Sequence, residues 1–329
     1  MFAHGKFYFS LIVFTILASQ NVSGKIRNYG DENDSDYKEN RGYAVGNKPY
    51  IIKGTDASIE EFPYVVFLTQ INPDGQGIES SRYGCTGVIL TSTVILTTAI
   101  CLEHGDDNDF AEERTLQFTN AYIKAGVTNR DDPRAKKIYF ARGILHDKYS
   151  YDQDYMQYNI ALLKLNRPLC RSKTIQPLKF ATEDDFEQAN KVGTVVGWGW
   201  KTANANSLSN TLQQIQMKSV PVDQCDEETG KFVNEHSFCV KDLNDTFQGG
   251  ICDGDSGTPF IVNNKVYAIG TTIAKGCKSA DYFVRVADHE IKSWIKDKCW
   301  ELHNEMRMKK SPNRPNRFLL EKNGSHSVP

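Results

Sequence analysis

The sequence predicts an all-β protein that ends in one amphipathic helix. Short runs rich in β-branched residues alternate with glycine-containing turns, which is the pattern of antiparallel strands. The clearest runs span residues 84–101, 159–165 and 191–199. Residues 287–300 instead place apolar side chains at helical spacing. Many short strands followed by one terminal helix indicate a β-barrel or sandwich architecture with a helix packed on it.

Length and charge narrow the class of protein. The 329 residues suffice for one large two-barrel unit or for two small domains. Hydrophobic residues make up 40%, which is ordinary for a globular protein. The 39 basic residues are matched by 41 acidic ones, so the chain has no field suited to nucleic acid or to an anionic membrane. We therefore expect neither as a partner.

The N-terminus has the pattern of a secretory signal peptide. Lys6 precedes an apolar run over residues 7–17, and small residues allow cleavage between 18 and 24. A membrane anchor is the alternative, but this run is shorter than the ~20 residues that span a bilayer. No later segment is long and apolar enough to span one. We expect a signal peptide over residues 1–24 and a secreted, extracellular protein.

The predicted folded domain lies between two polar segments. Residues 25–50 are charged, with a cluster of acidic residues at 31–36, and are interpreted as a pro-segment or linker. Residues 301–329 hold six Lys or Arg and three Pro, which predicts a disordered tail, with a short attachment arm as the alternative.

Eight cysteines, an even number, predict disulfides in an oxidising compartment. The chain has no Cys-x-x-Cys or His-Glu-x-x-His motif and its seven histidines are scattered, so we expect no metal site and no cofactor. Outside the predicted signal peptide, three Asn-x-Ser/Thr sequons predict glycosylation, at Asn33, Asn244 and Asn323.

One motif organises the chain. Residues 249–259 read Gly-Gly-Ile-Cys-Asp-Gly-Asp-Ser-Gly-Thr-Pro. This stretch resembles the nucleophile loop of the chymotrypsin/trypsin-like serine proteases, the S1 family, and the resemblance extends over residues 51–300. It implies two packed antiparallel six-stranded β-barrels with a cleft between them and a C-terminal α-helix. It also implies that Ser256 is the nucleophile and that the N–H groups of Gly254 and Ser256 form the oxyanion hole.

Two other positions depart from the family. Active members have the catalytic histidine just before the second cysteine of the first-barrel disulfide, where this chain has Ile100. The strand that begins with the orienting aspartate begins here with Asn159. A serine hydroxyl is a poor nucleophile without a base. His104 is the alternative base, but on a helical segment it would start about 5–6 Å from the required place.

The resemblance also implies disulfide pairings. It joins two cysteines of the first barrel, two in a second-barrel loop and two beside the substrate pocket, namely Cys85–Cys101, Cys225–Cys239 and Cys252–Cys277. Elimination then leaves Cys170 to pair with Cys299.

Activation in this family frees a new N-terminus that pairs with the aspartate before the nucleophile. The matching groups are the amine of Ile51 and the carboxylate of Asp255. The residue before the cut is Tyr50, however, and not the Arg or Lys after which trypsin-like activators cleave. Alternatively, Ile51 and Ile52 only begin a buried strand.

The predicted substrate pocket is also unusual. Gly250 occupies the floor position, so no preference for basic residues is encoded there. Ala274 ends a Thr-Ile-Ala segment where Ser-Trp-Gly would pair with substrate. Asp281 stands where a pocket-wall glycine is usual. It shortens the pocket, holds a basic side chain, or lies as a solvated loop aspartate; the sequence leaves these open.

These departures predict a catalytically inactive serine protease homologue that works by binding. By analogy with inactive members of the family, it acts as cofactor, decoy or regulator in a protease cascade, in immunity or in a reproductive fluid. Its expected partner is an extracellular protein: a protease, a zymogen or a secreted glycoprotein. The alternatives are an active endopeptidase that uses Ser256 with an unorthodox base, and a zymogen-like binder that is never cut before Ile51.

Overall fold

A computed structural model describes residues 51–72, 75–81, 83–103, 115–151, 156–182, 191–202, 207–220, 225, 235–244, 249–271 and 281–310. The predicted signal peptide and pro-segment, the sequons Asn33 and Asn323, and residues 311–329 lie outside the described residues.

The first half of the folded domain is a closed six-stranded barrel. Its strands follow the order β11-β5-β4-β2-β7-β8, and β8 pairs with β11 to close the ring. All of these pairings are antiparallel. The short strands β3 and β6 extend β2 and β8. The bounds are β2 Val65–Ile71, β3 Gly77–Ile78, β4 Gly84–Ile89, β5 Val94–Thr97, β6 Thr115–Gln117, β7 Tyr122–Ala125, β8 Lys136–Leu145 and β11 Ala161–Leu165.

The second half is another closed six-stranded barrel. Its order is β14-β13-β16-β17-β18-β15, closed by the pairing of β15 with β14. Strand β1 adds to β14, β12 adds to β17 in parallel, and β9 pairs with β10 outside both barrels. The bounds are β1 Thr55–Asp56, β9 Ser150–Tyr151, β10 Met156–Gln157, β12 Lys179–Phe180, β13 Val192–Gly197, β14 Gln213–Val220, β15 Ser237–Asp242, β16 Thr258–Val262, β17 Lys265–Thr271 and β18 Asp281–Arg285.

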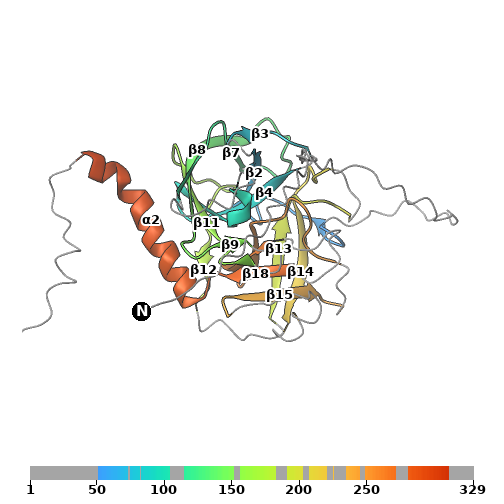
Figure 1. Ribbon diagram of the computed structural model, residues 1–329. Helices are drawn as coiled ribbons and strands as arrows, with labels where there is room; N and C mark the ends of the chain where they lie inside the picture. Colours follow the sequence, from blue (N-terminus) through green and yellow to red (C-terminus); the bar gives the residue numbers. More distant parts are fainter. Residues whose placement is uncertain are drawn as a thin grey trace, which may run out of the picture. The chain divides into compact units, whose positions relative to one another are not determined.

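The two barrels confirm the predicted fold class, and Figure 1 shows their strands with α2 running outside them. The strands form because β-branched and aromatic residues fill the interior of each ring. Residues Val94–Thr97 of β5, for example, are buried throughout. In the second barrel Phe238, Phe260 and Phe283 meet with ring centroids 5.6–6.0 Å apart.

The C-terminal helix α2 spans His289–Lys310. Asp288 begins it, because its Oδ1 accepts the N–H groups of Glu290 and Ile291 at 2.9 and 3.2 Å. Ile291, Trp294 and Ile295 of the predicted apolar stripe are buried, and Leu302 continues it at 1% exposure. Residues 301–310 were predicted to belong to a disordered tail, but they are helical. The packing of Leu302 explains why the helix continues past residue 300. Within the described residues, no helix is long and apolar enough to cross a membrane.

Candidate active site

The nucleophile loop is fixed where the two barrels meet. The backbone oxygen of Ser256 accepts the N–H of Thr86, in β4 of the first barrel, at 2.8 Å. The next residue, Gly257, has φ +87°, and a Cβ there would lie 2.0 Å from the Thr86 oxygen. Only glycine allows this approach of the two backbones. The loop geometry therefore holds Ser256 against the first barrel.

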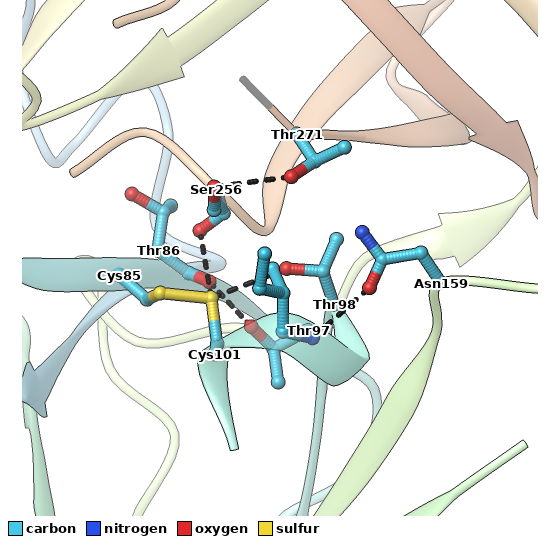
Figure 2. Close-up of a disulfide and its surroundings, with 9 residues drawn as sticks. Cys85, Thr86, Thr97, Thr98, Cys101, Asn159, Ser256 and Thr271 are labelled. Carbon is cyan, nitrogen blue, oxygen red and sulfur yellow. Dashed lines mark hydrogen bonds between the residues drawn. A yellow bond between two sulfur atoms is a disulfide. The ribbon is translucent and has the colours of Figure 1, made fainter. Parts of the chain in front are cut away.

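The side chain of Ser256 is half-buried, and its hydroxyl pairs with another hydroxyl. Ser256 Oγ lies 3.2 Å from Oγ1 of Thr271, at the end of β17. Figure 2 marks this hydrogen bond. Among the residues that the structure describes, no imidazole or carboxylate hydrogen-bonds this oxygen. A second hydroxyl has no tendency to remove the serine proton at neutral pH. Sequence reasoning missed Thr271, although it immediately precedes the segment expected to pair with substrate.

Ile100 and Asn159, predicted to replace the base and its orienter, are brought together. Ile100 lies in the short 3-10 helix η1 (Ala99–Cys101), and its N–H donates to Oδ1 of Asn159 at 3.0 Å. Asn159 is fully buried and precedes β11. The Cys85–Cys101 disulfide anchors the other end of η1, and Cys101 Sγ lies 3.4 Å from the oxygen of Ser256 (Figure 2). His104 lies outside the described residues.

The predicted oxyanion hole consists of two backbone N–H groups of the loop. Gly254 has φ +93°, a left-handed conformation that favours glycine. In the described structure, the backbone N–H groups of Gly254 and Ser256 donate no hydrogen bond, so they are available to an incoming oxygen. The side chain of Leu208 packs on Gly254, with Cδ2 2.1 Å from where a Cβ would be. The two N–H groups that the resemblance assigns to the oxyanion hole are thus unoccupied in the described structure.

Asp255 is completely buried and holds the loop from inside. Its Oδ1 accepts the N–H of Gly199 at 2.7 Å, and its Oδ2 accepts the N–H of Cys252 at 3.1 Å. Burial raises the pKa of this carboxyl to about 7, and the nearby charge of Asp253 adds to the effect. The structure gives Asp255 no ion pair within the described residues.

Ile51, the predicted partner of Asp255, is buried in the uncut chain. Its nitrogen belongs to a peptide bond, its φ is +44°, and its oxygen accepts the N–H of Gly54. The next residue, Ile52, forms an isolated antiparallel bridge with Gly250. The alternative that Ile51 and Ile52 begin a strand is wrong, since β1 starts at Thr55. The activation pair remains a prediction for a cut chain.

Substitution of Gly199 by alanine is expected to lower the free energy of unfolding by about 2 kcal/mol or more. A Cβ at Gly199 would lie 2.1 Å from Oδ2 of Asp255, so the buried carboxylate would have to leave its two N–H donors. Urea unfolding of Gly199→Ala measures the effect. In an Asp255→Ala background the same substitution should cost much less. Equal costs in the two backgrounds would contradict this role for Asp255.

Asp281 occupies the space over the predicted pocket floor. It lies in β18 at 6% exposure, and its Oδ2 accepts the N–H of Ile251 at 2.7 Å. A Cβ on Gly250 would lie 2.1 Å from that oxygen. The interpretation as a solvated loop aspartate is therefore wrong. Burial raises the pKa of Asp281 well above its usual range. Ala274 lies outside the described residues.

The disulfide predictions have mixed outcomes. Cys85–Cys101 and Cys225–Cys239 are confirmed. Cys252 is disulfide-bonded, and its predicted partner Cys277 lies outside the described residues.

The pairing of Cys170 with Cys299 is wrong, because both are free thiols. Cys170 is exposed, whereas Cys299 packs on the core from α2, where burial raises its pKa to about 11. A disulfide needs two Cβ atoms about 4 Å apart and facing one another. The pair was predicted only because these two cysteines were left over, and that reasoning says nothing about the distance between them.

Asn244, the one sequon asparagine within the described residues, has its N–H bonded to Oδ1 of Asp242 at 3.1 Å. Across the described part of the chain, no group of three or more His, Cys, Asp or Glu side chains could hold a metal ion.

Known proteins share this architecture. The family model named Trypsin matches residues 51–295. Serine protease grass of Drosophila melanogaster is 28% identical over 216 residues, which cover 64% of this chain and 54% of that protein. Hypodermin-A of Hypoderma lineatum is 27% identical over 222 residues, covering 67% of this chain and 75% of that protein. The chain thus spans about half the length of the first relative.

Two solved structures show the same fold. The protein named GrC has a TM-score of 0.61 at 20% identity, over 75% of this chain and 98% of that one. A scabies mite inactivated protease paralogue has a TM-score of 0.60 at 20% identity, over 74% of this chain and 97% of that one. The match of the family model, over most of the folded domain, establishes that the chain belongs to the trypsin family of serine proteases.

Proposed function

We propose that this protein is a secreted trypsin-family member that acts by binding another extracellular protein and does not hydrolyse peptides. One observation carries the proposal: the hydroxyl of Ser256 pairs with that of Thr271. Ile100 and Asn159, which the resemblance assigns to the positions of the base and its orienter, hydrogen-bond each other. Without a base, a serine hydroxyl keeps its proton at neutral pH. Loss of the base in a convergent triad lowers kcat about 10⁶-fold, roughly 8 kcal/mol of barrier.

The substrate pocket supports the same proposal. Asp281 places a buried carboxyl group against Gly250, at the position expected to be the pocket floor. A side chain that enters there meets a polar group that already bonds the N–H of Ile251. The carboxyl group at this position favours a protein that binds partners through its surface over one that binds a substrate side chain in the pocket.

The biological role follows by analogy. A relative 28% identical is named a serine protease, and a protein of the same fold is an inactivated protease paralogue. Trypsin-family proteins that lack hydrolysis serve as cofactors, decoys or regulators of proteases. We therefore place this chain in an extracellular pathway of that kind: a protease cascade, immunity or a reproductive fluid. Its signal-like N-terminus and its disulfides support that compartment.

The experiment that tests this function is turnover of a diverse peptide panel by the secreted protein, with Ser256→Ala as the matched control. The proposal expects the same background rate for both. The rival, an endopeptidase with an unorthodox base such as His104, expects turnover that disappears in Ser256→Ala.

N-terminal sequencing of the secreted chain separates two forms of the proposal. A mature chain that begins near residue 25 has never been cut before Ile51 and is a zymogen-like binder. A chain that begins at Ile51 carries an ammonium able to pair with Asp255. Tyr50 at the scissile position favours the uncut form, because trypsin-like activators cut after Arg or Lys.

A further inference from the structure

A cavity of about 520 Å³ is lined by Arg130 and does not include Ser256 in its lining, and we call it the Arg130 pocket. Three turns form it: one after β3, one after β7 and one before β14. It is lined by Glu79–Ser81, Arg130–Asp131, Lys201, Ser207–Leu208 and Asn210. None of these residues takes part in the candidate active site except Leu208, whose side chain packs on Gly254.

Arg130 is the unusual member of this lining. The residue is only 5% exposed, and its guanidinium donates to three neutral oxygens. Nε donates to the backbone oxygen of Ser209 at 3.0 Å, Nη1 to that of Ser80 at 3.3 Å and Nη2 to Oδ1 of Asn210 at 3.2 Å. Its face packs on the ring of Phe67, 5.3 Å from the centroid. In the described structure this cation forms no ion pair.

A buried guanidinium without a carboxylate is uncommon, because a desolvated charge is costly unless it is paired. Arginine cannot relieve that cost by losing its proton. Three of its five N–H groups are used, which leaves two donors in a side chain that lines a cavity. A carboxylate that entered the cavity would supply the missing charge and accept those donors.

The nearby acids do not already fill this role. Glu79 accepts hydrogen bonds from Lys124, from the hydroxyl of Tyr122 and, at 3.3 Å, from Lys137. These bonds hold the pKa of Glu79 at about 2, so it stays ionised and engaged. Asp131 and Glu79 both attract Arg130 through space, but neither forms a hydrogen bond with it. In the described structure, the guanidinium of Arg130 therefore has no carboxylate in hydrogen-bond contact and can still accept one as a ligand.

We propose that the Arg130 pocket is a docking site for a glutamate or aspartate side chain presented by a segment of a partner protein. The carboxylate would pair with Arg130, and the serines and Asn210 of the lining would bond the polar backbone of the segment. Leu208 supplies the apolar wall. The inference rests on the proposed binding function and names the chemistry of the partner.

The lining favours an isolated carboxylate over a polyanion. Glu79 and Asp131 line the cavity together with Arg130 and Lys201, so the acids match the bases and the cavity has no excess of positive charge for a chain of closely spaced sulfates. A single acidic side chain flanked by neutral residues needs no such excess. This difference makes a sulfated glycan a distinct outcome of the test.

The test uses the full secreted chain and two fluorescein-labelled octapeptides, one with a single central glutamate and one with glutamine there. We expect the glutamate peptide to bind and to shift the Arg130 Nε–H signal in NMR spectra. The glutamine peptide and the Arg130→Gln variant should each weaken binding about tenfold or more. Arg134→Gln is the matched control, because it removes an exposed guanidinium outside this pocket and should leave binding unchanged.

Asp131→Asn gives a second readout that does not depend on removing Arg130. Because it deletes a like charge beside the incoming carboxylate, it should tighten binding about two- to fivefold. A merely structural lining would not produce a gain of affinity. If Arg130→Gln fails to fold, Asp131→Asn therefore still decides the question.

Equal binding of the two peptides would overturn the inference, as would unchanged or weaker binding by Asp131→Asn. Heparin that binds more tightly than the glutamate peptide, and competes with it, would assign the pocket to sulfated glycans and also overturn it. None of these results depends on the chemistry of Ser256. Failure here is thus distinguishable from failure of the proposed function, which peptide turnover would reveal.

Discussion

The double variant Ile100→His, Asn159→Asp is expected to be acylated at Ser256 by p-nitrophenyl acetate at least ~10³-fold faster than the wild type. A histidine at position 100 would extend from η1, whose end is held by the Cys85–Cys101 disulfide. An aspartate at position 159 can still accept the N–H of residue 100 and can orient the new imidazole. The N–H groups of Gly254 and Ser256 already make no other hydrogen bond in the described structure.

The acylation rates of the two single variants show how much each substitution contributes to the rate of the double variant. Ile100→His alone should recover much less, because an asparagine favours the wrong imidazole tautomer and lowers kcat about 10⁴-fold in well-characterised members of this family. Asn159→Asp alone supplies an orienter without a base and should stay at the wild-type rate. Adding Ser256→Ala to the double variant must abolish the acyl-enzyme. A wild type acylated at Ser256 as fast as the double variant would refute our assignment of the missing base.

The second large effect is a loss of stability of the uncut chain as the pH rises towards neutrality. Asp255 is buried, and its pKa is raised from 3.8 to about 7. Because the folded-state pKa lies above the unfolded one, the stability that Asp255 contributes is complete below pH 3.8. It is lost as the pH rises through 7. Between pH 5 and pH 8 the expected loss is about 2–3 kcal/mol.

Urea unfolding of the wild type and of Asp255→Asn at pH 5 and pH 8 measures this contribution. Asparagine cannot ionise, so its pH dependence should lack the Asp255 component. Comparing the two also cancels His146, whose burial lowers its pKa to about 4 and which therefore destabilises the fold as the pH falls. The same slope in both proteins would contradict the unpaired state of Asp255. A chain cut before Ile51 should lose the effect, because the new ammonium neutralises the carboxylate.

The sequence predicts the barrels because each strand can be recognised from its own run of β-branched residues and the turns that bound it. Residues 84–97 hold β-branched runs bounded by turns, and Cys85 and Cys101 fix how they close. Ile100 and Asn159 could be assigned because each lies at a fixed offset from such a landmark, one residue before a cysteine or at the start of a strand. The place of a residue in the fold can be predicted from local sequence where a landmark close to it in the chain fixes that place.

Contacts between distant segments could not be predicted in this way. The burial of Asp281 depends on the absence of a side chain at Gly250, and the pairing of Ser256 with Thr271 depends on how two strands end. The Arg130 pocket joins three turns that are far apart in sequence. The Cys170–Cys299 pair was predicted wrongly for the same reason, because a count of cysteines does not say which of them lie close together in the fold.

The most direct test of the central claim is fluorophosphonate labelling of the secreted wild-type protein, because this reagent reports a serine whose proton is taken by a base. Our account predicts that the wild type and Ser256→Ala remain equally unlabelled, while the double variant of residues 100 and 159 is labelled. Labelling of the wild type that disappears in Ser256→Ala would contradict the claim and identify a working protease.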